Sequence, residues 1–123
     1  MNLWQDISSL FDVEFGILES LEVRDDVLYI KINSDSQIAV VIFWEFLSHR
    51  FIIESYALSI LDEHDLNGKS WIFKSNKGEF YDWFNKQSYG IYGDNLHIYR
   101  LIFLHHIIDV LSPTQPEFYN LAL

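Results

Sequence analysis

The alternation of apolar and polar side chains near the start of the chain predicts an antiparallel hairpin. Residues 17–24 and 27–33 are both rich in aliphatic side chains, and Asp25 and Asp26 between them are typical of a tight turn. In the second segment aliphatic side chains alternate with other types, which is the period of a strand with one face on a core. We therefore expect two paired strands with a polar outer side.

Three other segments show the 3.6-residue repeat of a helix. A short first helix is predicted over residues 3–11. Residues 38–47 form a β-branched run that favours a strand, but the polar residues around it share one side of a helical wheel, so we interpret the run as a mostly buried helix. The clearest helix follows Asn76 and Glu79, which are spaced as N-cap and N3. Its apolar stripe consists of Phe80, Trp83 and Phe84.

The most apolar stretch is residues 95–112, where ten of eighteen side chains are aliphatic or Phe. We interpret it as two strands, residues 96–103 and 107–111, with a turn near His105. A single buried helix is the alternative, because periodicity does not separate the two. Two prolines in residues 112–116 predict that regular structure stops there.

Further strands are predicted at residues 51–60 and 71–74, on either side of an acidic loop. At 123 residues the chain has the size of one domain, and we assign residues 1–123 to it. The elements together predict an α+β fold, with a single antiparallel sheet and two or three helices packed on it.

The net charge of −10 lies entirely in the first half of the chain. Residues 1–66 carry 13 acids and three bases, whereas residues 67–123 carry five of each. Such a field repels nucleic acid and anionic membranes and attracts cationic partners. Solubility alone is the plain alternative explanation. The charge therefore argues against direct nucleic-acid binding and favours a basic protein partner.

The cellular compartment is predicted from features that the sequence lacks. Without Cys there is neither a disulfide nor a thiolate metal ligand, which fits a reducing compartment. The first residues do not resemble a secretory signal, and the longest charge-free apolar run is too short for a membrane span. We expect a soluble cytoplasmic protein, with no cofactor.

One cluster suggests an enzyme. His97, His105 and Asp109 would share a face if their segment kept strand register, and two imidazoles with a carboxylate could hold a metal or run acid–base chemistry. A small metal-dependent hydrolase is therefore an alternative function. Against it, the predicted turn near His105 breaks the register, and histidines on apolar strands are more often structural.

The chain resembles in overall character the small bacterial immunity proteins, including those that neutralise contact-dependent growth-inhibition toxins. The resemblance rests on the acidic, Cys-free single domain, the aromatic helix at residues 78–84 (GEFYDWF) and the ending at residues 108–113 (IDVLSP). It implies a stoichiometric inhibitor that binds one cognate toxin, often a basic nuclease, and blocks its active site without a cofactor. No residue role is transferred by it.

For such a contact we expect carboxylates to meet a cationic groove and aromatic residues to anchor it. A homo-oligomeric adaptor that buries its aromatic residues is a further alternative, and the sequence leaves the oligomeric state open. The expected partner-binding residues are Asp62, Glu63 and Asp65 first, then Asp25 and Asp26, with Tyr89 and Tyr92 as apolar anchors.

Overall fold

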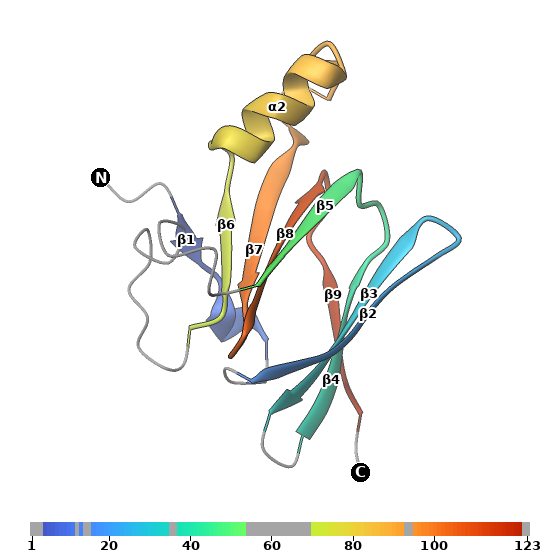
Figure 1. Cartoon of the computed structure of the whole chain (residues 1–123), viewed down its shortest axis with the longest axis vertical. Helices are drawn as coiled ribbons and strands as arrows, with labels where there is room; N and C mark the ends of the chain where they lie inside the picture. Colours follow the sequence, from blue (N-terminus) through green and yellow to red (C-terminus); the bar gives the residue numbers. More distant parts are fainter. Residues whose placement is uncertain are drawn as a thin grey trace.

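The computed structural model describes residues 4–11, 13, 16–34, 37–53, 70–92 and 95–121. In these residues two antiparallel β-sheets lie face to face, and one α-helix extends from the end of the larger sheet (Figure 1). The five-stranded sheet contains, in spatial order, β1 (Gln5–Asp6), β6 (Ile72–Ser75), β7 (His97–Ile102), β8 (His106–Ser112) and β5 (Ser48–Ile53). The four-stranded sheet contains β2 (Ile17–Arg24), β3 (Val27–Ser34), β4 (Gln37–Phe43) and β9 (Glu117–Leu121).

The main core lies between the two sheets. Alternate side chains of β3 and β4 point inward and meet the inward side chains of β7 and β8, as expected for strands with a period of two. Burying each aliphatic side chain of this kind contributes about 1.5–3 kcal/mol. The largest contributors that are almost fully buried are Leu28, Ile30, Phe43, Trp71, Tyr99, Leu101 and Phe103.

A second core covers the opposite face of the five-stranded sheet. There Ile98, Ile102, Ile107 and Leu111 pack with Phe80 of the helix α2 (Glu79–Gln87). The central strands β7 and β8 are thus apolar on both sides. This explains why residues 95–112 read as a continuous apolar run, and it confirms the prediction of two strands separated by a turn.

The prediction of an α+β fold with a single sheet and two or three helices is wrong. The described residues form two sheets and a single α-helix. Residues 38–47 are not a helix, because residues 37–43 form β4, whose outward positions are apolar too and hide the strand alternation. The predicted helix over residues 3–11 is wrong as well, since β1 and the 3₁₀ turn η1 (Ser8–Leu10) lie within the described residues 4–11.

Other predicted elements are confirmed with shifted ends. The hairpin is formed by β2 and β3, and its turn residues Asp25 and Asp26 have φ of 50° and 63°, as a tight hairpin turn requires. The predicted strand at residues 51–60 starts earlier as β5, and its part beyond residue 53 lies outside the described residues. The prolines after β8 do not end regular structure, because β9 follows them and pairs with β4.

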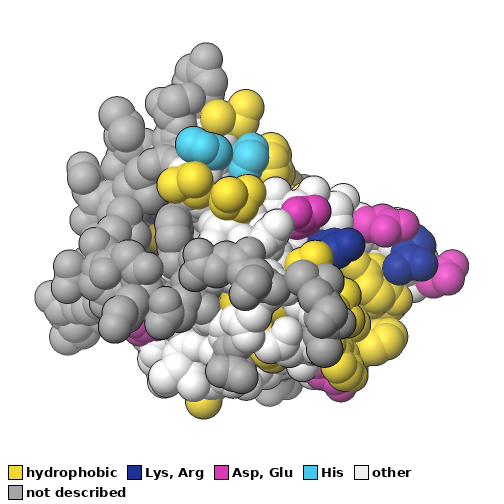
Figure 2. All heavy atoms as spheres, turned by 90° about the horizontal axis from the view of Figure 1, so that it is seen from below, with side chains coloured by type: hydrophobic (Ala, Val, Ile, Leu, Met, Phe, Trp, Pro, Cys, Tyr) yellow, Lys and Arg dark blue, Asp and Glu magenta, His cyan; other side chains and the backbone are white. Residues whose placement is uncertain are grey.

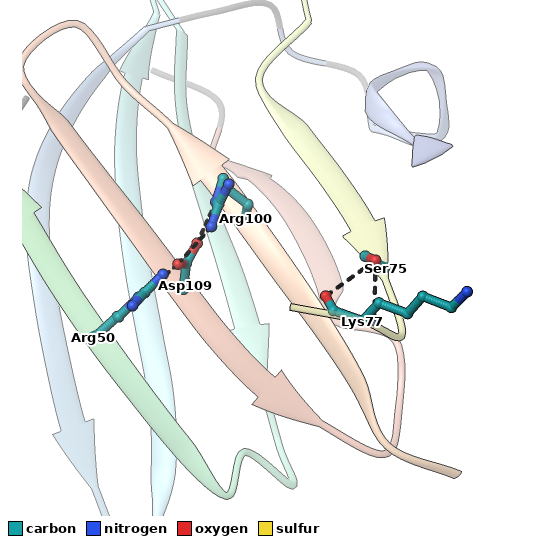
Figure 3. Close-up of polar contacts among 5 residues, drawn as sticks. All are labelled: Arg50, Ser75, Lys77, Arg100 and Asp109. Atoms are coloured by element: carbon teal, nitrogen blue, oxygen red, sulfur yellow. Dashed lines mark hydrogen bonds and ion pairs between the residues drawn. The ribbon is translucent and has the colours of Figure 1, made fainter. Parts of the chain in front are cut away.

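Helix α2 begins three residues after the predicted N-cap, Asn76. Its N-cap is Gly78, whose φ of 132° strongly favours glycine. Just before it, the Ser75 hydroxyl accepts the Lys77 N–H at 3.2 Å and lies 3.4 Å from the Lys77 carbonyl oxygen (Figure 3). This local bond fixes the chain as it leaves β6 for the helix. The described part of the chain has no helical segment with the length and hydrophobicity that a membrane crossing requires.

Three charged side chains lie on the helix-bearing face of the five-stranded sheet. Asp109 of β8 is fully buried between Arg100 of β7 and Arg50 of β5, and the three side chains form a line (Figure 3). Arg100 Nε lies 2.7 Å from Oδ1 and its Nη2 3.1 Å from Oδ2, while Arg50 Nε lies 2.8 Å from Oδ2. The carboxylate thus joins three neighbouring strands.

Aromatic rings cover both ends of this line. The Arg100 guanidinium carbon lies 4.3 Å from the centroid of the Trp4 ring, and that of Arg50 lies 5.0 Å from the centroid of the Phe80 ring. These distances are those of cation–π contacts. The ion cluster therefore connects the N-terminal segment and helix α2 to the same sheet face.

Replacing Asp109 by Ala leaves two partly or fully buried arginines without their shared carboxylate. We expect the free energy of unfolding to fall by about 3–5 kcal/mol, the usual cost of removing one partner from a buried ion pair. Urea denaturation measures it. The exposed Glu22→Gln variant, which breaks an ion pair in solvent, serves as control and should lose less than about 1 kcal/mol. Equal losses in the two variants would contradict a structural role for the cluster.

Candidate functional site: an acidic aromatic face

The outward face of the four-stranded sheet differs from that of its neighbour. Its side chains are mostly half-buried or exposed, although many are apolar or aromatic. Trp44, just after β4, is 48% exposed, and on β9 Tyr119 is 48% and Leu121 43% exposed. Large apolar side chains held at a surface mark protein contacts more often than chance. This face is the strongest candidate for a binding surface among the described residues.

Strand register sets four of its side chains in one row. Glu22 of β2 is opposite Tyr29 of β3, Tyr29 is opposite Ile42 of β4, and Ile42 is opposite Glu117 of β9. Residues directly opposite each other in an antiparallel pair put their side chains on the same face about 5 Å apart. The row therefore carries a carboxylate at each end and apolar groups between them.

At the β2 end the carboxylate and ring bind an arginine of the same chain. Arg24 Nε lies 3.0 Å from Glu22 Oε1, and the Arg24 guanidinium carbon lies 4.5 Å from the centroid of the Tyr29 ring. Both charged side chains stay more than half exposed. The pair contributes little to stability, because both side chains remain in solvent.

At the β9 end the carboxylate is held by an aromatic donor. The Tyr119 hydroxyl donates to Glu117 Oε2 at 2.5 Å. The Trp44 ring meets the Tyr29 ring edge-on, with centroids 6.4 Å apart. The bond from Tyr119, and then the nearby Trp44 side chain, lowers the pKa of Glu117, while the bond to Glu117 raises the pKa of the Tyr119 hydroxyl. Glu117 is therefore a positioned anion. We call Glu22, Arg24, Tyr29, Trp44, Glu117 and Tyr119 the acidic aromatic face.

Additional acids lie at the same end of the sheet. The pairing of Leu28 with Phe43 places the β2–β3 turn, with exposed Asp25 and Asp26, at the end where β4 leaves the sheet at exposed Glu45. Figure 2 shows acidic and basic side chains next to hydrophobic ones at its right-hand margin, the side on which Figure 1 draws this hairpin. Two of the predicted partner-binding carboxylates thus adjoin the acidic aromatic face.

The remaining predicted contact residues divide into three cases. Asp62, Glu63 and Asp65 lie outside the described residues. Tyr89, just after α2, is 94% exposed and has the rare positive φ of 55°. Tyr92 is half-buried. Its ring centroid lies 5.8 Å from that of Phe84, so it packs against helix α2 and is less available to a partner than Tyr89.

The residues considered for enzyme chemistry are not brought together. His97 shares the face of β7 that carries Tyr99, whereas Asp109 lies on the opposite face of the sheet beside Arg100. His105 lies in the β7–β8 turn and is exposed. A shared metal or proton-transfer site would need all three on one face, so this cluster does not exist in the folded chain.

His97 and His106 fit structural roles. Burial, and then the nearby Lys74, lowers the pKa of His97, which favours its neutral form. The His106 ring stacks on Phe51 with centroids 5.1 Å apart, and Figure 2 shows histidine side chains beside hydrophobic ones. Within the described residues, no three His, Asp or Glu side chains are grouped so as to hold a metal ion.

Sequence reasoning missed most of the acidic aromatic face. The apolar run predicts a helix at Trp44, and the prolines predict that regular structure ends before Glu117 and Tyr119. Two signals favour strands instead. Residues 38–44 are a β-branched run whose alternate positions are apolar on both faces, and residues 117–121 (EFYNL) contain the β-favouring Phe118 and Tyr119.

Comparison with known proteins adds no assignment: no protein-family model, curated protein or solved structure matches the chain.

The bond between Tyr119 and Glu117 can be tested by titration. In Tyr119→Phe the main group that stabilises the Glu117 anion is lost, so the carboxyl pKa should rise toward its ordinary value of 4.5. Because the pKa is lowered in the folded chain, Glu117 contributes stability above pH 4.5 that is lost as the pH falls through the folded value, and the variant should show less of this contribution. Carbon-13 NMR of the side-chain carboxyl measures the shift. Tyr29→Phe is the control and should leave the Glu117 titration unchanged.

Proposed function

We propose that this chain is an immunity-type protein that acts in the cytoplasm, binding a cognate, basic toxin domain and neutralising it by covering its active site. The acidic aromatic face is the observation that carries the proposal. It combines positioned carboxylates with half-exposed rings on a rigid sheet, which is the composition of a surface that binds a cationic protein.

Rigidity favours tight binding on this face. Arg24 contacts the Tyr29 ring, Tyr29 contacts the Trp44 ring, and Glu117 is held by the Tyr119 hydroxyl, so less side-chain freedom remains to be lost on association. Aromatic side chains bury a large area at a low cost in rotamer entropy. Carboxylates that are desolvated against a partner's cations can show coupling energies of about 1.5–7 kcal/mol. A few residues here could therefore dominate the affinity.

Charge favours a basic partner. The described strands of the four-stranded sheet and their turns carry six carboxylates against two cations. The carboxylates are Glu19, Glu22, Asp25, Asp26, Glu45 and Glu117, and the cations are Arg24 and Lys31. This excess attracts a cationic surface over distances of about 8–10 Å at physiological salt. The predicted contributions of Asp62, Glu63 and Asp65 would add to the same field.

The enzyme alternative has weaker support, since the predicted His97, His105 and Asp109 cluster is split between two faces of a sheet and a turn. The exposed Tyr89 supports a second, smaller contact in the immunity-type proposal.

Co-expression with the product of the adjacent upstream gene tests the proposal directly. We expect a one-to-one complex in which the basic partner loses its activity. Failure to form any complex with it would contradict the proposal.

The role of the turn acids can be measured by association kinetics. Asp25→Asn with Asp26→Asn removes two charges while keeping a residue type that tolerates positive φ. At low ionic strength we expect the association rate with the partner to fall roughly three- to tenfold, with a flatter salt dependence, since steering by charge raises association rates by 10-fold or more.

The matched control is Glu79→Gln with Asp82→Asn on helix α2, which removes the same charge from another element. It should change the rate by less than about twofold, because steering depends on where a charge lies. Equal slowing in both variants would mean that only net charge matters. Unchanged kinetics in the turn variant would remove Asp25 and Asp26 from the approach surface.

A further inference from the structure

We propose that Glu117, Trp44 and Tyr119 form a subsite that binds an arginine side chain of the partner protein. The inference rests on the proposed function and specifies the chemistry of its contact. It begins from the symmetry of the acidic aromatic face, which has a carboxylate beside an aromatic ring at each end.

One end already shows what this arrangement binds. Glu22 and Tyr29 hold the guanidinium of Arg24 of the same chain, with the carboxylate on its Nε at 3.0 Å and the ring 4.5 Å from its central carbon. A guanidinium is weakly hydrated and planar, so it can stack on a ring and form hydrogen bonds in its plane at the same time. This end of the face is therefore filled by the chain itself.

The other end has the same components without a cation. Among the described residues, none of the cation–ring contacts involves Trp44 or Tyr119, and no lysine or arginine pairs with Glu117. Both rings are about half exposed, at 48% each. An incoming guanidinium would thus find ring surface and a carboxylate together.

The carboxylate keeps room for a ligand. A carboxylate has about four acceptor positions, and Tyr119 fills one of them. The remaining positions can accept the parallel N–H groups of a guanidinium. The bond from Tyr119 also holds the Glu117 carboxylate in place. Lysine offers a single compact ammonium that gains less from stacking, so the subsite favours arginine.

Its location is suited to a protein ligand. Glu117 and Tyr119 belong to β9, which is an edge strand of the four-stranded sheet. The other edge, β2, is interrupted by a register shift between Leu18 and Ser20 and carries several charges, which are features that protect an edge. Within its described residues β9 has a single charged residue, Glu117, and no register shift. A partner segment can therefore approach along β9 and place an arginine at its first residue.

The test uses a small probe, so that it does not depend on the partner. The blocked tripeptide acetyl-Gly-Arg-Gly-amide is titrated into the full chain, and the indole N–H signal of Trp44, assigned with Trp44→Phe, is followed by NMR. We expect a saturable shift. The same tripeptide with citrulline, which has the shape of arginine without its charge, should give none, and the lysine tripeptide should bind at least threefold more weakly.

Variants separate the subsite from the general field. Glu117→Gln should weaken arginine binding at least fivefold and Tyr119→Phe about two- to threefold, because the carboxylate is then absent or held less firmly. Glu79→Gln on helix α2 removes an equal charge elsewhere and should change binding by less than twofold. Absence of a saturable shift, equal binding of citrulline, or equal effects of Glu117→Gln and Glu79→Gln would overturn the inference.

Failure of the inference and failure of the proposed function give different results. If the partner complex forms and Glu117→Gln leaves its affinity unchanged, the subsite is refuted while the immunity-type function stands. If the arginine tripeptide binds as expected but no partner complex forms, the subsite stands and the proposed function falls.

Discussion

A single buried carboxylate determines which segments cover the outward face of the larger sheet. Asp109 has no exposed surface, so water cannot stabilise its negative charge. The guanidinium groups of Arg50 and Arg100 stabilise it instead. These arginines in turn stack against Trp4 and Phe80. The N-terminal segment and helix α2 are therefore placed where they can shield the ion cluster, on the outward face of the five-stranded sheet.

The outward face of the five-stranded sheet is covered, whereas the outward face of the four-stranded sheet is partly exposed. Every apolar side chain on the outward face of β7 and β8 is buried under this cover, whereas the outward face of β4 and β9 keeps Trp44, Tyr119 and Leu121 in contact with solvent. An exposed apolar sheet face is costly to solubility and invites association. Its retention beside ordered carboxylates makes sense if a charged partner covers it, and this asymmetry between the two sheets is the structural basis of the proposed function.

The sequence predicted local structure best where one face of a strand is buried and the other is polar. The hairpin of β2 and β3 follows from the alternation around Tyr29 and Lys31, and α2 from the spacing of Phe80 and Phe84. Prediction failed at β4, because Ile38, Val40 and Ile42 are apolar outward residues that make a strand look like a buried helix. The second sheet was missed because β4 was interpreted as a helix and because the prolines at residues 113 and 116 hid β9.

The candidate binding residues were predictable to a different degree. Charge counting singles out Asp25 and Asp26 as candidates, because an excess of acids is visible without a fold. It could not find Glu117, which lies in the electrically balanced half of the chain and meets Trp44 only through the pairing of β9 with β4. Likewise, His97 and Asp109 could be grouped in sequence only by ignoring the turn that separates their strands.

These two kinds of carboxylate act over different distances. In the proposed function the exposed turn acids act through a field that salt screens within about 8–10 Å, so they would influence how fast a basic partner arrives. Glu117 would act only in contact, where the Tyr119 hydroxyl already fixes its direction, so it would influence how long the partner stays. A binder with both can be fast and selective at once. Net charge alone, read from the sequence, supplies only the first property. The second requires β4 and β9 to meet in one sheet, where Ile42 pairs with Glu117, 75 residues further along the chain.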